Sequence, residues 1–161
     1  MKSIQQWINE YGESHQNPTN KAIHWICVPL IMLSLLALLG KIPFFINEQI
    51  LFSIGSEPIL LNWTILFLAF CVAFYLRLSF TLSVGMLLVS LCMLFLISYM
   101  KYYDSEVWRL SLAIFIFAWI GQFIGHKIEG KKPSFFEDLQ FLLIGPAWLL
   151  SFIYKKIGIK L

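Results

Sequence analysis

The chain has 161 residues, of which 59% are hydrophobic and only 13% charged, and its formal net charge is +3 at pH 7. Soluble domains carry roughly 45–50% apolar and about 25% charged residues, so this composition indicates an integral membrane protein and excludes an ordinary soluble domain. The basic residues form no continuous stripe, which argues against nucleic acid as a partner. The length suits one integral membrane domain over residues 1–161, and no oligomeric state is indicated.

A polar stretch that includes two histidines precedes and enters the first apolar segment. Asn17 is the expected N-cap of a helix, and Pro18 suits its first position, where a missing N–H does no harm. The helix then carries Asn20 and His24 four residues apart on one face. His15 lies just before this start, so the first polar cluster is expected at one end of the first membrane helix.

Four apolar stretches approach or reach the length of a membrane span, namely 23–39, 59–76, 80–100 and 110–123. Crossing about 30 Å of hydrocarbon takes roughly 20 apolar residues at a rise of about 1.5 Å per residue. Lipid offers no partners for backbone N–H and C=O groups, so each stretch is expected to be a helix. The connection over 40–58 contains two short apolar runs that could lie along the membrane interface.

A second polar cluster, formed by Gln122, His126 and Glu129, follows the fourth apolar stretch. Four crossings return the chain to the side on which it began, so both clusters should face the same membrane surface. Gln122 precedes His126 by one helical turn, and His126 and Glu129 are three residues apart, close enough to share one ion. Gly130 and Pro133 indicate that the helix ends here.

A fifth apolar segment, 139–154, is shorter than most and is interrupted by Gly145-Pro146. If it spans fully, six Lys and Arg residues fall on each side and indicate no orientation. If it re-enters or lies in the interface, the three C-terminal lysines change sides and the balance becomes nine to three. The positive-inside rule then places both termini and both histidine clusters in the cytoplasm, at a bacterial inner membrane or the endoplasmic reticulum. The predicted fold is thus an all-α polytopic membrane helical bundle, with four transmembrane helices and a fifth short segment that is re-entrant or interfacial.

All three histidines of the chain lie in the two polar clusters. Histidine is the commonest ligand of transition metals, and nitrogen together with carboxylate oxygen suits iron, zinc, copper or nickel. The candidate metal ligands are His15, His24, His126 and Glu129. Asn20 and Gln122 are placed to orient a ligating imidazole or a bound water. The cysteines lie in apolar runs without CxxC spacing, so neither a disulfide framework nor a zinc knuckle is expected.

The residues of both clusters form a combined pattern with defined spacings. It comprises Tyr11, His15, Asn17, Asn20, His24 and Val28-Pro29, and then Trp119, Gln122-Phe-Ile-Gly125-His126, Glu129, Pro133 and Ile144-Gly145-Pro146. This pattern resembles the small membrane family of yeast-type 2-hydroxy-fatty-acid dioxygenases, whose founding member acts in converting phytosphingosine to odd-numbered fatty acids. The resemblance covers both ends of the chain, while the middle spans match only in being apolar. Ser134 departs from the small apolar residue expected after the proline.

The resemblance implies an Fe(II)-dependent α-oxidation, in which a 2-hydroxy fatty acid and O2 give the fatty acid one carbon shorter, CO2 and water. The 2-hydroxy acid supplies the electrons, so no nucleotide or flavin motif is required. By this resemblance His15, His24 and His126 are ligands, and Glu129 is a ligand or a base. The acyl tail would lie among the helices. The basic side chains that would attract the substrate carboxylate are Lys127, Lys131 and Lys132.

Two other functions fit the same residues. Three histidines and a carboxylate also suit zinc, so a zinc-dependent lipid hydrolase is one alternative. The other is a non-catalytic membrane protein that binds lipid or haem, with the histidines as amphipathic side chains at a wet boundary. Tyr11, Trp25 and Trp119 are expected to be packing or interfacial side chains in every case.

Overall fold

The structure is a computed structural model that describes all residues except 1, 46–48, 55–56, 105 and 131–134; of residues 52, 54, 57 and 135–141 only the backbone is described. The described part contains six helices and one pair of strands. The elements are α1 (Ile4–Glu13), α2 (Pro18–Leu39), β1 (Ile50–Ile54), β2 (Glu57–Leu60), α3 (Trp63–Leu78), α4 (Phe80–Tyr103), α5 (Val107–Glu129) and α6 (Phe135–Ile157). The expectation of an all-α fold holds apart from the two short strands.

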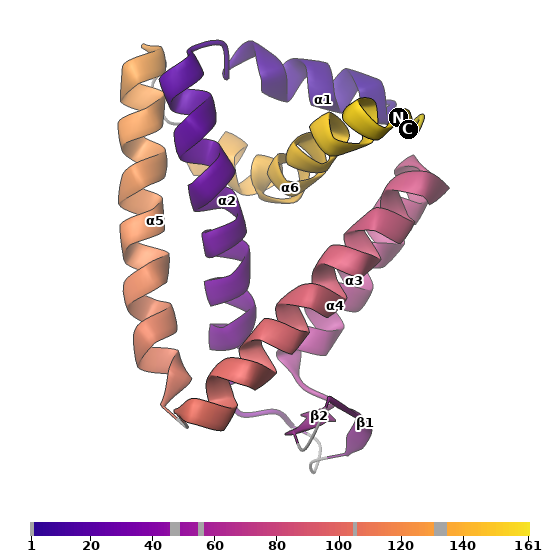
Figure 1. Ribbon diagram of the computed structural model, residues 1–161, viewed down its shortest axis with the longest axis vertical. Coiled ribbons are helices and arrows are strands. Elements are labelled where there is room, and N and C mark those ends of the chain that lie inside the picture. Colours follow the sequence, from indigo (N-terminus) through magenta and orange to yellow (C-terminus); the bar gives the residue numbers. More distant parts are fainter. Residues whose placement is uncertain (1, 46–48, 55–56, 105, 131–134) are drawn as a thin grey trace.

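The centre of the arrangement is the antiparallel pair α2 and α5, which lie side by side (Figure 1). Helix α1 lies across the end where α2 begins and α5 ends. Helices α3 and α4 form an oblique hairpin, and the strands lie at the opposite end of α2. Helix α6 passes behind α2 and brings the C-terminus close to the N-terminus. The start of α2 and the end of α5 are therefore at the same end of the bundle.

Among the residues that the structure describes, three helices, α2, α4 and α5, are long and apolar enough to cross a membrane. Large apolar side chains on their outer faces are exposed, as in Phe95 (54%) and Phe117 (72%), which suits contact with lipid. Helix α3 has 16 residues and therefore a length of about 24 Å, short of the roughly 30 Å of a hydrocarbon core. The structure thus supports a membrane protein with three candidate spans, while the expected fourth span and the re-entrant or interfacial fifth segment stay predictions.

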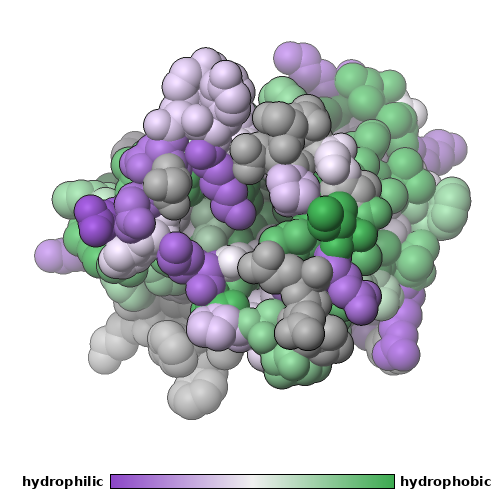
Figure 2. All heavy atoms as spheres, turned by 90° about the horizontal axis from the view of Figure 1, so that it is seen from below, coloured by the Kyte–Doolittle hydropathy of each residue, from purple (hydrophilic) through white to green (hydrophobic). Residues whose placement is uncertain are grey.

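Helix α3 is shorter than expected because its N-terminal part forms a strand. Residues 59 and 60 pair with β1 in an antiparallel ribbon, and the helix begins only after Asn62. The Asn62 side chain accepts a hydrogen bond from Ile65 N (3.2 Å), which caps the helix at this point. Figure 2 looks onto this end of the molecule, where hydrophilic side chains lie among hydrophobic ones.

Helix α6 runs through Gly145-Pro146 without a break, so the predicted interruption of the fifth segment is wrong. Proline has no backbone N–H, so the carbonyl group four residues before it loses its helical hydrogen bond. In a packed bundle, neighbouring groups can supply a donor to such a carbonyl, and the helix then continues. The surrounding residues 144–150 are all buried against the rest of the molecule. Packing of α6 against α1 and α4 therefore outweighs the local tendency to break.

The N-terminal stretch forms a helix, α1, that the sequence analysis did not predict. Ser3 and Gln6 make a capping box, with Ser3 Oγ accepting from Gln6 N and Gln6 Oε1 accepting from Ser3 N. Ile4, Ile8 and Tyr11 are buried on one face, while the opposite face is polar. This amphipathic helix carries the chain to His15 at the end of the bundle.

Two glycines of α5 permit its close approach to α2. A Cβ added at Gly121 would lie 2.6 Å from Cys27 Sγ. A Cβ at Gly125 would overlap Asn20 Oδ1 and lie 3.3 Å from His24 Cε1. The Asn20 amide is held by hydrogen bonds to Ser14 and Glu129, so it cannot simply rotate away. Gly125 is thus needed for the packing of the polar cluster.

We predict that Gly125→Ala lowers the stability of the protein in detergent by about 1–3 kcal/mol, because the added methyl group overpacks this contact. In an ordinary helix interior the same change is stabilising by roughly 0.5–1 kcal/mol, so the sign of the effect is diagnostic. Leu112→Ala, at a lipid-facing position of α5, is the matched control. Thermal unfolding monitored by circular dichroism measures both, and a Gly125→Ala variant more stable than the wild type contradicts the prediction.

Candidate metal centre

The three histidines converge at the end of the bundle where α2 begins and α5 ends. His15 lies in the turn after α1, His24 in the second turn of α2, and His126 in the last turn of α5. One ligand atom from each lies within 4.8 Å of the other two. Their ring centroids are 4.2–5.5 Å apart, and all three pairs meet edge to face. The two polar clusters expected to share one membrane surface are therefore in direct contact.

Hydrogen bonds define the tautomers of two of these rings. His15 Nδ1 lies 2.7 Å from Tyr11 O, and His24 Nδ1 lies 2.9 Å from Asn20 O. A carbonyl oxygen can only accept, so each Nδ1 carries the proton and donates it. Each neutral ring then has its lone pair on Nε2. Such hydrogen bonds from the distal nitrogen are the usual way in which proteins orient metal-binding imidazoles.

The burial of the cluster supports a function for these lone pairs. His15 and His24 are 1% and 0% exposed, and His126 is half-buried. Within the described residues, His24 Nε2 has no hydrogen-bond partner although it is buried. A buried acceptor without a partner is costly and rare, so its position beside two other imidazoles calls for an explanation.

A transition-metal ion fits this donor set. Imidazole nitrogen suits iron, zinc, copper and nickel alike. Metal–nitrogen bonds of about 2.0–2.1 Å hold neighbouring ligand atoms roughly 3–3.5 Å apart, so small side-chain rotations bring the three nitrogens into range. Three histidines also leave coordination positions for other ligands, which a site for chemistry requires.

The Glu129 carboxylate contacts the turn between α1 and α2. Its Oε1 accepts from Gln16 N (2.7 Å), and its Oε2 accepts from Asn17 N (2.9 Å) and from Asn20 Nδ2 (3.0 Å). These bonds connect the end of α5 to the segment that carries His15 and starts α2. Glu129 is not part of the group of three ligand atoms. Its role as a ligand or base stays a prediction, and the structure gives its oxygens other partners.

The remaining predicted site residues lie around the same end of α5. Asn20 is fully buried, and besides Glu129 its amide donates to Ser14 O (3.3 Å). Gln122 is buried one turn before His126. Lys127 is exposed next to His126, while Lys131 and Lys132 lie outside the described residues. The sequence-based roles of Gln122 and of the lysines stay predictions.

The aromatic side chains that pack on His15 were not predicted from the sequence. Tyr11 stacks on His15 with centroids 4.2 Å apart and an interplanar angle of 13°. Trp148 of α6 contacts both, at 5.2 Å from each ring. Tyr11 was expected to pack, but its partner was unknown, and Trp148 follows the Gly145-Pro146 pair without any local signal of this contact. Helix α6 thus completes one side of the cluster.

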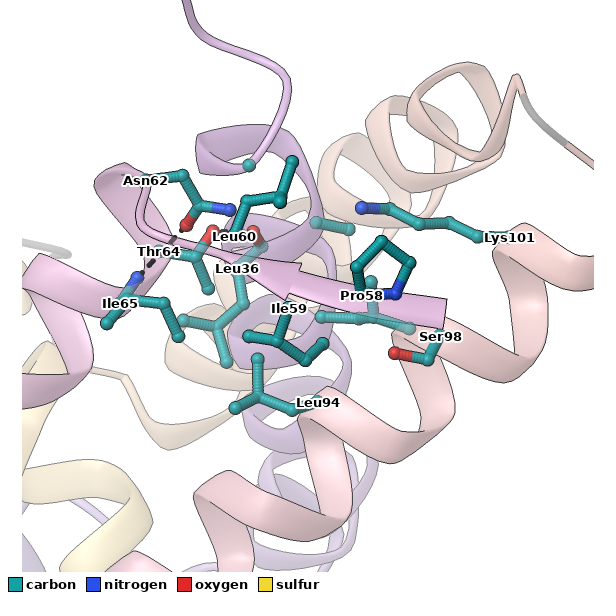
Figure 3. Close-up of a pocket in the computed structure, with 13 residues that line it drawn as sticks. Leu36, Pro58, Ile59, Leu60, Asn62, Thr64, Ile65, Leu94, Ser98 and Lys101 are labelled. Carbon is teal, nitrogen blue, oxygen red and sulfur yellow. Dashed lines mark hydrogen bonds between the residues drawn. The ribbon is translucent and has the colours of Figure 1, made fainter. Parts of the chain in front are cut away.

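A pocket of about 90 Å³ at the other end of α2 is remote from this chemistry (Figure 3). Leu36 and Thr64 line it, together with Ser98 and Lys101 of α4. Leu36 is twelve residues beyond His24 on the same helix, which places it about 18 Å away. The pocket contains no cluster of metal-ligating side chains, among the described residues, comparable to the three histidines. The histidine cluster is therefore the candidate functional site.

Comparison with known proteins identifies the family of the chain. The 2-hydroxy-palmitic acid dioxygenase Mpo1-like family matches residues 1–157, which include all three histidines. The 2-hydroxy-palmitic acid dioxygenase MPO1 of Saccharomyces cerevisiae is 29% identical over 153 residues, covering 92% of this chain and 78% of the yeast protein. No solved structure matches the chain. The resemblance predicted from the histidine clusters is confirmed, and the chain belongs to the 2-hydroxy-palmitic acid dioxygenase Mpo1-like family.

Proposed function

We propose that this protein is an Fe(II)-dependent membrane dioxygenase that shortens 2-hydroxy fatty acids by one carbon. The convergence of three imidazoles from three separate segments, with ligand atoms within 4.8 Å of one another, is the observation that carries the proposal. The family and the name of the yeast relative support the substrate class. The three candidate spans support a substrate that arrives from a lipid phase.

The proposed reaction balances without a further reductant. A 2-hydroxy fatty acid and O2 give the fatty acid one carbon shorter, CO2 and water. The carboxyl carbon leaves as CO2, the former C2 becomes the new carboxyl carbon, and O2 takes up the electrons released. Bound Fe(II) would supply the activation of O2 and the chelation of the substrate hydroxyl and carboxylate, which is the chemistry of open histidine-rich iron sites.

The residues of the chain would prepare this site. We assign His15, His24 and His126 as the iron ligands, because their ligand atoms converge and because the rings of His15 and His24 have Nε2 available for a metal ion. Asn20 holds the His24 ring through its carbonyl and the α1–α2 turn through its amide. Gln122 would orient His126 or a bound water. Lys127 would attract the substrate carboxylate to this end of the bundle.

The activity is tested with protein purified without a polyhistidine tag, loaded with Fe(II) under anaerobic conditions and supplied with 2-hydroxypalmitate. We expect O2 consumption and equimolar pentadecanoate and CO2, with no O2 uptake on palmitate, which lacks the 2-hydroxyl. Absence of shortened product from protein with demonstrated iron contradicts the proposal. Hydrolysis of an ester lipid by zinc-loaded protein would instead favour the hydrolase, and a visible haem absorption band the haem-binding alternative.

We predict that His15→Ala, His24→Ala and His126→Ala each abolish turnover and weaken Fe(II) binding by more than the roughly 10–100-fold cost of losing an outer partner of a metal ligand. Anaerobic competition with a chromophoric chelator measures the affinity. Thr19→Ala, at an exposed position in the first turn of α2, is the control and should retain both properties. Unchanged iron affinity in the histidine variants would exclude the cluster as the iron site.

A second prediction concerns Glu129, whose oxygens accept hydrogen bonds from N–H groups of the α1–α2 turn. Glu129→Gln replaces one acceptor by an NH2 group that faces other donors, so the turn with His15 should loosen. We expect a 10–100-fold loss of Fe(II) affinity. Backbone hydrogen exchange at Gln16 and Asn17 should become faster in the metal-free protein.

Glu106→Gln, which changes a carboxylate at the opposite end of α5, is the matched control for this variant. It should alter neither the iron affinity nor the exchange of the α1–α2 turn. If Glu129→Gln weakens iron binding as strongly as the histidine variants without changing the exchange, Glu129 is a direct ligand. If neither quantity changes, the carboxylate has no part in the site.

A further inference from the structure

A groove of about 550 Å³ lies between α1 and the C-terminal half of α6, where the two chain ends approach each other (Figure 1). Sites for small molecules usually have volumes of about 300–1,000 Å³, so the groove is large enough for a ligand. Its lining combines the apolar side chains of Ile8, Trp148, Phe152 and Ile159 with polar and basic ones, those of Gln5, Asn9, Ser151, Lys155 and Lys160. This combination suits an amphiphile whose apolar part lies along the apolar side chains.

The inner end of the groove is adjacent to the histidine cluster. Trp148 lines the groove and is also the residue whose ring lies 5.2 Å from the His15 ring. Phe152, one turn further along α6, meets Trp148 edge to face at 4.8 Å and continues the apolar surface outwards. Trp148 is therefore the residue that the groove and the histidine cluster share, which brings the groove next to the cluster.

From these observations we propose that the groove binds the acyl chain of the fatty-acid substrate, an inference that rests on the proposed function. The carboxylate and the 2-hydroxyl group face the histidines, and the methyl end lies toward Ile159. The aliphatic stems of Lys155 and Lys160 cover the chain, while their ammonium groups stay in water. In this placement Trp148 lies beside the part of the acyl chain that follows the reacting carbons.

A second large groove among the described residues is a poorer candidate. It has about 420 Å³ and lies between α3 and α4, with an almost entirely apolar lining that includes Leu68, Val72 and Leu91. It has no charged lining residue and contains none of the residues that contact the three histidines. It suits the tail of a surrounding lipid and serves as the alternative in the test.

The location is tested with metal-free protein and a 2-hydroxy fatty acid that carries a diazirine near its methyl end. After irradiation, peptide mass spectrometry should find the label on α1 and on the segment from Phe152 to Leu161, and excess 2-hydroxypalmitate should suppress it. Label on α3 and α4, or label that the competitor does not suppress, overturns the proposal. Because no turnover is needed, this result is independent of whether the protein proves to be a dioxygenase.

The matched variants Ile159→Trp and Ile153→Trp test the groove by function. Ile159 lines the groove, whereas Ile153 lies on α6 outside its lining. The two side chains are similarly exposed, Ile153 at 46% and Ile159 at 41%. With Ile159→Trp we expect the KM for 2-hydroxypalmitate to rise about tenfold, because the indole displaces methylene groups of the acyl chain from the apolar side chains of the groove. A short 2-hydroxy acid of eight carbons should keep its KM, and Ile153→Trp should change neither value. Equal effects on both chain lengths, or of both variants, contradict the proposal.

Discussion

The close antiparallel contact of α2 and α5 is the constraint on which the site depends. His24 and His126 belong to these two helices, and Gly125 allows the helices to approach because a Cβ there would overlap Asn20 and crowd His24. A larger residue at this position would have to displace Asn20, which is itself held by hydrogen bonds. In a membrane, where helices gain little from apolar burial alone, small residues of this kind are the common means of bringing backbones together. Helix packing and the metal-binding geometry therefore share one contact.

The third histidine is added by a different kind of interaction. His15 is not on a membrane-spanning helix, so its position depends on the turn between α1 and α2. The Glu129 carboxylate holds this turn through backbone N–H groups of Gln16 and Asn17, and Tyr11 and Trp148 pack on the ring of His15. Hydrogen bonds to an ionised carboxylate are stronger than those between neutral groups, so one carboxylate with several N–H donors can hold a short segment. The ends of α1, α2 and α5 and the middle of α6 thus meet at one point.

The sequence predicted the parts of this arrangement that follow from local rules or from the number of crossings. Asn17 caps α2 as expected, and four passes of the chain, α2 to α5, bring His24 and His126 to the same end. The partners of Glu129 could not be predicted, because they lie 109 to 113 residues away in the chain. The strand before α3 and the unbroken helix through Pro146 were also missed. Pairing within a short hairpin decided the first, and packing of α6 against α1 and α4 decided the second.

The charge balance of the site argues for the division of roles proposed above. Three neutral imidazoles bring no charge, so a bound divalent ion would leave the cluster at +2 in surroundings where charge is poorly solvated. An anionic 2-hydroxy acid offsets part of this charge, and it does so more effectively when no protein carboxylate is already a ligand. His126 is only half-buried, so one side of the cluster stays near water. A carboxylate that organises the turn without binding the metal therefore leaves the positive charge for the substrate, and affinity for the acid would follow from the ligand set itself.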